Sequence, residues 1–204
     1  MREFWNQKFS GEAYKYGEQP NAFLAEQAQR YLGAGAKVLV PGDGEGRNGV
    51  WLAEQGFEVT SLDCSDVGLA KAQDLAKRRG VVVQTVLADL TEWEPPAASF
   101  DAVAVSYLHL TSAQRPAIMG ALMRALRPGG VLILEAFHPT QLGLSSGGPK
   151  DVDMLYTLEG LREDAKACGR AGQELSGVVC ETLLNEGPFH QGLARVTRWI
   201  WQAA

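Results

Sequence analysis

A glycine-rich loop and a carboxylate downstream of it are the residues whose types and spacing most clearly suggest chemistry. Gly42, Gly44 and Gly46 alternate with acidic residues between an apolar segment and a helical pattern. Glycines in such a loop allow the backbone to approach a ligand closely. Asp63 ends the next apolar segment, where a carboxylate can accept hydrogen bonds from both hydroxyls of a ribose. The loop and Asp63 together predict recognition of an adenosine group.

Arg47 helps to decide whether the adenosine group belongs to NAD or to S-adenosylmethionine. Counted from Gly42, a dinucleotide-binding loop of the form G-x-G-x-x-G places its third small residue at position 47, where this chain has an arginine. The large side chain disfavours the close helix–strand packing that a third glycine permits, and the chain lacks a Tyr-x-x-x-Lys pair. The loop therefore favours S-adenosylmethionine over NAD, and an NAD-linked oxidoreductase is kept as the alternative.

Several further segments resemble the motifs of class I S-adenosylmethionine-dependent methyltransferases. The loop, residues 38–48, resembles the first motif of that family, and its Gly-Arg-Asn ending is similar to the tellurite-resistance (TehB-like) and thiopurine methyltransferase-like branch. The other matching segments are residues 60–63 (second motif), 88–90 (adenine-binding segment), 100–103 (fourth strand) and 126–130 (the turn before the fifth strand). The resemblance implies an enzyme that uses S-adenosyl-L-methionine as its methyl donor.

The loop and the resemblance together predict a set of cofactor-binding residues. They are Tyr16, Gly42, Asp43, Gly44, Gly46, Arg47, Asn48, Asp63, Cys64, Asp89, Leu90 and Ser106. Asp89 has an alternative role in helix capping or at the solvated surface. The family usually has an acid two residues before the first loop glycine, where this chain has Val40, so Asp43, Glu45 or a water could take its place.

His109 and His190 are the candidate catalytic residues. Methyl transfer from a sulfonium is a direct displacement, so a base within reach helps only when the acceptor is a hydroxyl or an amine. His109 follows the apolar segment that ends at Ser106, and its alternative role is structural. The resemblance places His190 near the acceptor. Arg195 and Arg198 could bind an anionic acceptor or remain solvated charges.

The aromatic residues near the N-terminus have two interpretations. Tyr14 and Tyr16 are the better candidates for a lid whose rings pack over the sulfonium, because they lie in a polar stretch. Trp5 and Phe9 have helical spacing and are expected to pack against the protein. The loop at residues 138–153, which begins with a histidine, could form the opposite wall of the site.

The hydrophobic pattern predicts strands that alternate with helices. Strands are expected at residues 37–40, 57–62, 81–87, 102–106, 131–137, 174–184 and 193–201. Helices are expected at residues 22–32, 48–55, 67–79, 112–126 and 158–168. Alternation with continuous apolar strands is typical of a parallel sheet that helices cover. We expect an α/β, Rossmann-like, doubly wound fold with a mostly parallel seven-stranded sheet, helices on both faces and an antiparallel C-terminal strand.

The length and composition limit the organisation of the chain and its partners. The 204 residues are expected to form one methyltransferase domain: a lid and helix region at 1–34, a cofactor-binding core at 35–137 and an acceptor-side region at 138–204. With 19 basic and 24 acidic residues, the net charge of −5 gives no electrostatic signature for nucleic acid or an anionic membrane. A monomer or homodimer is expected.

The three cysteines, Cys64, Cys168 and Cys180, have no CxxC spacing and are odd in number. This pattern predicts neither a disulfide framework nor a metal site, and it fits a reducing cytoplasm. The function we expect is S-adenosylmethionine-dependent methyl transfer to a small-molecule acceptor, and the resemblance suggests a thiol or a tellurium or selenium oxyanion. A non-catalytic S-adenosylmethionine-binding protein is the second alternative.

Overall fold

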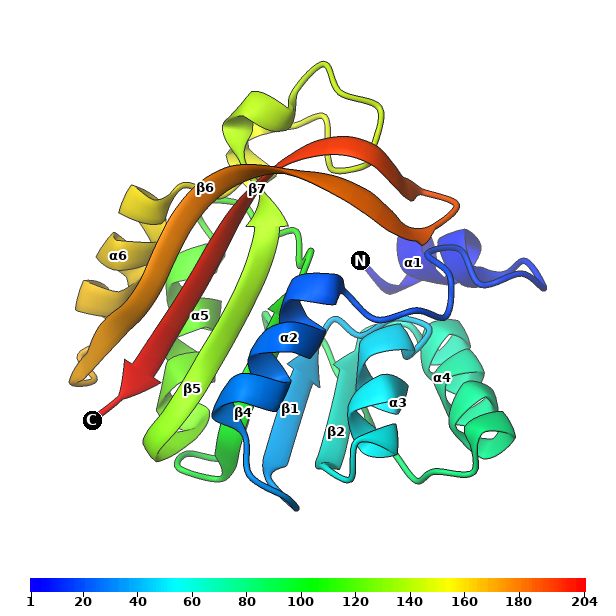
Figure 1. Cartoon of the computed structure of the whole chain (residues 1–204), viewed down its shortest axis with the longest axis horizontal. Helices are drawn as coiled ribbons and strands as arrows, with labels where there is room; N and C mark the ends of the chain where they lie inside the picture. The colour runs from blue at the N-terminus through cyan, green and yellow to red at the C-terminus, as the bar shows by residue number, and fades with distance from the viewer.

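The computed structural model describes residues 1–204 and contains one seven-stranded sheet with the strand order β3-β2-β1-β4-β5-β7-β6 (Figure 1). The strands are β1 (Lys37–Pro41), β2 (Glu58–Asp63), β3 (Gln84–Leu87), β4 (Phe100–Ser106), β5 (Leu126–Phe137), β6 (Gly172–Gly187) and β7 (His190–Ala203). β1 to β5 pair in parallel, whereas β7 runs antiparallel to both β5 and β6. The predicted fold class is confirmed.

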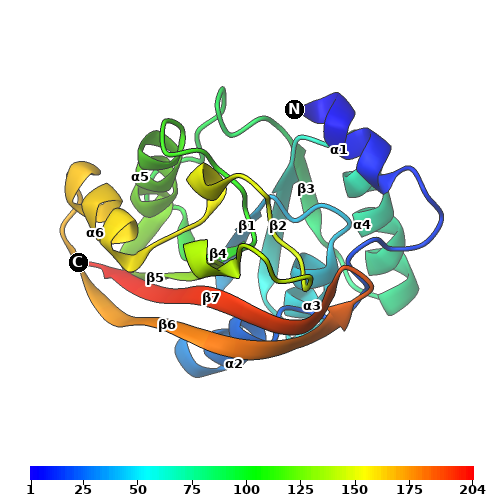
Figure 2. The same ribbon diagram turned by 90° about the horizontal axis from the view of Figure 1, so that it is seen from above.

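Helices cover both faces of the sheet (Figures 1 and 2). They are α1 (Arg2–Phe9), α2 (Ala22–Tyr31), α3 (Arg47–Glu54), α4 (Asp66–Arg79), α5 (Arg115–Ala125) and α6 (Leu158–Ala167). One buried cluster joins α2, α3 and α4 to one face, and a larger one joins α5 and α6 to the other. β4 lies between them, and Ala102 and Val103 in it are fully buried. Burial on both faces explains the uninterrupted apolar sequence of this strand.

Local sequence signals fix the helices that flank the ligand-binding edge. Ser65 begins α4 by accepting a hydrogen bond from Gly68 N at 3.0 Å, and Gly80 ends it in the left-handed conformation at φ 71°. Asn21 begins α2 in the same manner by accepting from Leu24 N at 2.8 Å. These caps fix where α2 and α4 begin, and both helices pack on the same face of the sheet.

All seven strands differ from the predicted bounds by at least one residue, and β5 and β3 show why. β5 begins at Leu126, five residues before the predicted 131, because Leu126 already pairs with β4 across a register shift. β3 lacks residues 81–83, because Val81 N donates to Ala76 O and thereby closes the end of α4. The boundary of β5 is decided by pairing with another strand and that of β3 by a hydrogen bond within the end of α4, and the apolar pattern reveals neither.

The C-terminal hairpin extends well beyond the rest of the sheet. β6 and β7 pair from Gly172 to the tip, where only Pro188 and Phe189 separate the strands, and the hairpin arches towards α1 (Figure 1). The predicted strands stop short of this tip, so Glu186 and His190 lie on strands and not in a loop. No helix in the chain is both long and apolar enough to span a bilayer.

Candidate active site

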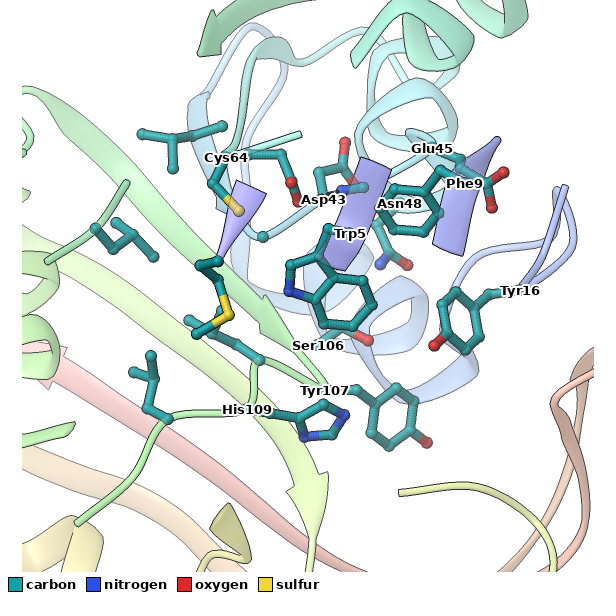
Figure 3. Close-up of a pocket in the computed structure, with 18 of the residues that line it drawn as sticks. Trp5, Phe9, Tyr16, Asp43, Glu45, Asn48, Cys64, Ser106, Tyr107 and His109 are labelled. Carbon is teal, nitrogen blue, oxygen red and sulfur yellow. Dashed lines mark hydrogen bonds between the residues drawn. The ribbon is translucent and has the colours of Figure 1, made fainter. Parts of the chain in front are cut away.

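A cavity of about 1030 Å³, which includes space open to solvent, lies at the carboxyl ends of β1, β2 and β4. This is the edge where open α/β sheets bind ligands. All but one of the predicted site residues line it, namely Tyr16, Gly42, Asp43, Gly44, Arg47, Asn48, Asp63, Cys64, Asp89, Leu90, Ser106, His109 and His190. Figure 3 shows many of these side chains converging from different elements on one space.

Gly46 is the predicted residue that does not line the cavity. It lies at the N-terminal end of α3 in the left-handed conformation, with φ 87°. A Cβ atom at this position would lie 2.5 Å from the Cβ of Ala72 in α4. Gly46 is therefore required for packing between α3 and α4, and its assignment as a cofactor-binding residue is corrected.

The glycine loop is tied to the end of β2 through Asp63. Its Oδ2 accepts from Gly44 N at 2.8 Å, and its Oδ1 accepts from Ser65 N at 2.8 Å. Each carboxylate oxygen has further lone pairs, so Asp63 keeps capacity to accept hydrogen bonds from a ligand. Burial raises the pKa of Asp63, although these backbone donors oppose the shift. The predicted ribose acceptor is thus both pre-oriented and at the cavity wall.

Asp43 and Glu45 do not replace the missing acid at Val40 in a simple way. Asp43 accepts from Ser61 Oγ at 2.5 Å and from Gly49 N at 3.2 Å, and burial raises its pKa to about 6. Both of its carboxylate oxygens therefore have partners within the protein. Glu45 pairs with a lysine of α4 and accepts from the backbone of the N-terminal segment. Asp43 connects the glycine loop to β2 through its hydrogen bond with Ser61, and Glu45 connects the N-terminal segment to the same loop.

The remaining predicted cofactor residues line the cavity beyond Asp63. Burial raises the pKa of the Cys64 thiol to about 11, so it is a neutral side chain. Asp89 accepts from both the backbone N and the Oγ1 of Thr91, at 3.0 and 2.8 Å, which stabilises a turn in the loop after β3, where no helix begins. Ser106 Oγ is buried and has no hydrogen-bond partner in the chain. An unpartnered buried hydroxyl at a cavity wall indicates that a ligand completes its hydrogen bonding.

The N-terminal helix α1 covers the glycine loop with aromatic rings. Trp5 and Phe9 stack with their ring centroids 5.4 Å apart and line the cavity (Figure 3). These two side chains pack against the protein as predicted, and they also form part of the cavity wall, which was not predicted. Tyr14, predicted as a lid residue, lies outside the cavity, where its hydroxyl donates to Lys71 O at 2.9 Å. Tyr16 lines the cavity as predicted.

The opposite part of the cavity is a wall of rings from distant parts of the chain. The ring of His190 lies 4.9 Å from that of Tyr16 and 4.5 Å from that of Tyr107, between centroids. His109 makes no hydrogen bond within the chain, and burial lowers its pKa to about 4. Tyr107, which the sequence reasoning missed, has a left-handed backbone with φ 52° and donates to a buried Glu135 at 2.6 Å.

A network of buried charges supports this wall. Glu135 of β5 accepts from Asn21 at 2.6 Å and from Arg198, and Asn21 also donates to Glu186 at 3.0 Å. Glu186 in turn pairs with Arg47 at 2.8 Å. The sequence reasoning missed Asn21 and Glu135. The available signal was a lone glutamate inside the apolar run of β5, because buried carboxylates are rare without partners.

Three residues considered for the acceptor side do not line the cavity, and the contacts of Arg195 agree with its alternative interpretation as a solvated charge. Arg198 is held by Glu135 and stacks over Phe23, with its guanidinium carbon 4.9 Å from the ring centroid. Arg195 pairs with Glu181 at the half-exposed surface. Neither arginine lines the cavity, and His138, proposed as part of the opposite wall, does not line it either. His138 caps a short 3-10 helix of the loop through its ring nitrogen.

Comparison with known sequences agrees with this geometry. A family model described as a methyltransferase domain matches residues 38–130. The demethylmenaquinone methyltransferase of Thermus thermophilus is 32% identical over 109 residues, which are 52% of this chain and 50% of that protein. The thiopurine S-methyltransferase of Gluconobacter oxydans is 40% identical over 68 residues, which are 32% of this chain and 31% of that protein. The chain thus spans about half the length, or less, of these curated relatives.

Comparison with solved structures supports the same fold. TehB from Haemophilus influenzae has a TM-score of 0.70 and 17% identity, over 100% of this chain and 67% of that one. The N-methyltransferase NodS from Bradyrhizobium japonicum, solved with S-adenosyl-L-homocysteine, has a TM-score of 0.68 and 15% identity, over 99% of this chain and 97% of that one. The family model and the relatives show that residues 38–130 are similar to a methyltransferase domain, and the solved structures show that the whole chain shares the fold of TehB and NodS.

Proposed function

We propose that this protein transfers a methyl group from S-adenosylmethionine to an uncharged small-molecule acceptor, and that the acceptor carries a thiol. The observation that carries the proposal is the cavity at the carboxyl edge of the sheet, which has a glycine loop and Asp63 at one end and a wall of rings at the other. The match of residues 38–130 to a methyltransferase domain supports S-adenosylmethionine as the donor. The neutral aromatic and imidazole rings that line the other end of the cavity support the choice of a thiol as acceptor.

The side chains of the cavity fit the parts of S-adenosylmethionine. Asp63 would accept from the ribose hydroxyls, and the buried Ser106 hydroxyl has no partner without a ligand. The cofactor is cationic at its sulfonium and its amine, and the rings of Trp5, Phe9 and Tyr16 can attract such charges through their π faces. The bound cofactor supplies an activated methyl group. The protein's part is to orient the acceptor and to exclude water.

The charges around the cavity disfavour an oxyanion as acceptor. Arg47 is the only lysine or arginine side chain that lines the cavity, and it is already paired with Glu186 at 2.8 Å. Burial lowers the pKa of both His109 and His190, which keeps these rings neutral near neutral pH. A tellurium or selenium oxyanion would lose its hydration without gaining an unpaired cationic side chain of the protein. A thiol is soft, neutral and small, and the match to a thiopurine S-methyltransferase is compatible with it.

The direct test is turnover with a matched acceptor panel. Purified protein with S-adenosylmethionine would be given simple neutral thiols, carboxylated thiols, and tellurite and selenite, and S-adenosylhomocysteine formation would be followed. We expect transfer to neutral thiols, with at least a tenfold preference over the carboxylated ones. Preferred methylation of an oxyanion would refute the choice of acceptor. Tight cofactor binding without transfer to any acceptor would favour the non-catalytic alternative.

A further inference from the structure

His190 presents one ring nitrogen to the cofactor loop. It is the first residue of β7, it is 5% exposed, and its ring lines the cavity. Its Nδ1 lies 3.4 Å from Nη2 of Arg47, the first residue of α3. Because a guanidinium nitrogen can only donate, Nδ1 must accept in this contact and cannot carry a proton. A neutral imidazole has one N–H, so the proton lies on Nε2.

Two hydrogen bonds hold the Arg47 guanidinium in the position where it faces Nδ1 of His190. Its Nη1 donates to Glu186 Oε2 at 2.8 Å and to Gln19 O at 3.1 Å. The side chains of Arg47 and Glu186 are 8% and 7% exposed, so water does not compete with this pair. A buried arginine paired with a carboxylate is costly to break, because it leaves an uncompensated charge. The guanidinium therefore faces His190 as a fixed donor.

We propose that Arg47 fixes His190 in the tautomer that carries its proton on Nε2, so that His190 donates a hydrogen bond to the methyl acceptor and does not take a proton from it. His190 Nε2 makes no hydrogen bond within the chain, so its N–H is left for a molecule bound in the cavity. The role towards the acceptor rests on the proposed function, whereas the tautomer does not.

The carboxylates near His190 do not reverse this assignment. Glu186 Oε2 lies 3.8 Å from Nδ1, beyond hydrogen-bond distance, and already accepts from Arg47. Burial lowers the pKa of His190, and Arg47 lowers it further, while Glu186 and Glu135 of β5 oppose the shift. The other groups that face the ring are Tyr16 of the N-terminal segment, Tyr107 after β4, and His109. None of these is a cation or a carboxylate at neutral pH. A proton on Nδ1 would point at another N–H.

The consequence is a direct link between the two ends of the cavity. Arg47 comes with the glycine loop that faces the cofactor, and His190 comes with the hairpin that faces the acceptor. Arg47 is therefore a positioning residue for the acceptor half, in addition to its place beside the cofactor loop. When the acceptor loses its proton, that proton leaves to water or another group, because His190 Nε2 is already protonated and Nδ1 is blocked.

The tautomer can be measured on the full chain by long-range proton–nitrogen correlation spectra of protein with isotope-labelled histidine. The chain has three histidines, His109, His138 and His190, so His190→Gln assigns the signal by its disappearance. We expect His190 to be neutral at neutral pH with its proton on Nε2. A proton on Nδ1 in the wild type, or a charged ring at neutral pH, would overturn the proposal without any mutation.

Arg47→Met tests whether the arginine is the cause. Without the guanidinium, Glu186 becomes the nearest partner of Nδ1, so we expect the proton to move to Nδ1 and the pKa of His190 to rise. Arg198→Met is the matched control, because this arginine belongs to the same buried network but pairs with Glu135. The control should leave the tautomer unchanged. An unchanged tautomer in folded Arg47→Met would refute the proposal, and if that variant does not fold, the wild-type spectrum decides.

The turnover of two His190 variants distinguishes a hydrogen-bond donor from a general base at this position. Glutamine can donate from its amide but cannot act as a base, so His190→Gln should keep kcat/KM within about fivefold, and His190→Leu should lose about 10- to 100-fold, as expected for one lost hydrogen bond. Equal loss in both variants would contradict the donor role. If the wild type methylates no acceptor, the proposed function fails, but the spectra still test the tautomer.

Discussion

The two ends of the cavity are built from the chain in different ways. The cofactor end comes from successive strand–loop–helix units, with Gly42, Gly44 and Asp63 at neighbouring strand ends. The acceptor end brings together Tyr16, which precedes the sheet, and His190 at the tip of a hairpin near the other end of the chain. Ligand sites of the first kind can be read from local spacing. Sites of the second kind depend on packing between distant segments.

The two ends also differ in what holds them. Asp63 is held by the backbone N–H groups of Gly44 in the glycine loop and of Ser65, which caps the next helix. His190 is held by a buried ion pair between Arg47 and Glu186, which are far apart in the sequence. The contrast predicts that substitutions at the cofactor end weaken cofactor binding, whereas those at the acceptor end lower kcat/KM. Arg47 is the one side chain that contributes to both ends.

The largest effect is expected from Asp63→Ala at the cofactor end. It removes the acceptor of Gly44 N and of the proposed ribose hydroxyls, and two charge-assisted hydrogen bonds at about 2 kcal/mol each correspond to about a 1000-fold loss of affinity. Calorimetric titration with S-adenosylhomocysteine measures it. Asp101→Ala is the control, because this strand-end acid pairs with Arg127 and lies outside the cavity lining. A loss in Asp63→Ala no greater than in the control would break the comparison.

The next effect concerns Asp43, a loop residue that is structural. Burial raises the pKa of Asp43 to about 6 in the folded protein, against 3.8 for an aspartate exposed to water. Between these values the folded state keeps a proton that the unfolded state has lost, so stability falls as the pH rises through about 6. At neutral pH the ionised carboxylate costs about 3 kcal/mol. Asparagine does not titrate and can still pair with Ser61 and Gly49 N.

The measurement for Asp43 is the free energy of unfolding of wild type and Asp43→Asn in denaturant at acid and neutral pH. We expect the difference, Asp43→Asn minus wild type, to grow in favour of the variant by about 2 kcal/mol between pH of about 4 and about 7. The S-adenosylhomocysteine affinity should change less than in Asp63→Ala. A constant difference across this pH range would mean that burial does not perturb Asp43.

The smallest effect is expected from His109→Phe at the acceptor end. Phenylalanine preserves a ring in the wall but removes the neutral nitrogen that has no partner in the chain, so kcat/KM should fall about tenfold, which is about 1.4 kcal/mol. Cofactor affinity should stay within about twofold. Arg195→Ala is the control, because Arg195 pairs with Glu181 away from the cavity, and it should leave both quantities unchanged. Weakened cofactor binding in His109→Phe would contradict the division into two ends.

The sequence predicted the cofactor end better than the acceptor end for a physical reason. All but one of the predicted cofactor residues line the cavity, because parallel strand ends must meet at one edge once the fold class is known. Gly46 is the exception, since only the distance to Ala72 reveals its packing role. Tyr14 and Arg198 were misplaced because side-chain direction near a hairpin or an extended segment depends on partners that local spacing does not specify.

By itself, the sequence determined the fold class, the strand–helix alternation and the glycine loop with its acid. Each of these depends on interactions between near neighbours or on a period of two or three to four residues. Only the tertiary structure placed Arg47 against His190 and Glu186, and Glu135 against Asn21 and Tyr107. A buried charge is tolerated only beside its partner, and which partner lies there is decided when distant segments pack together.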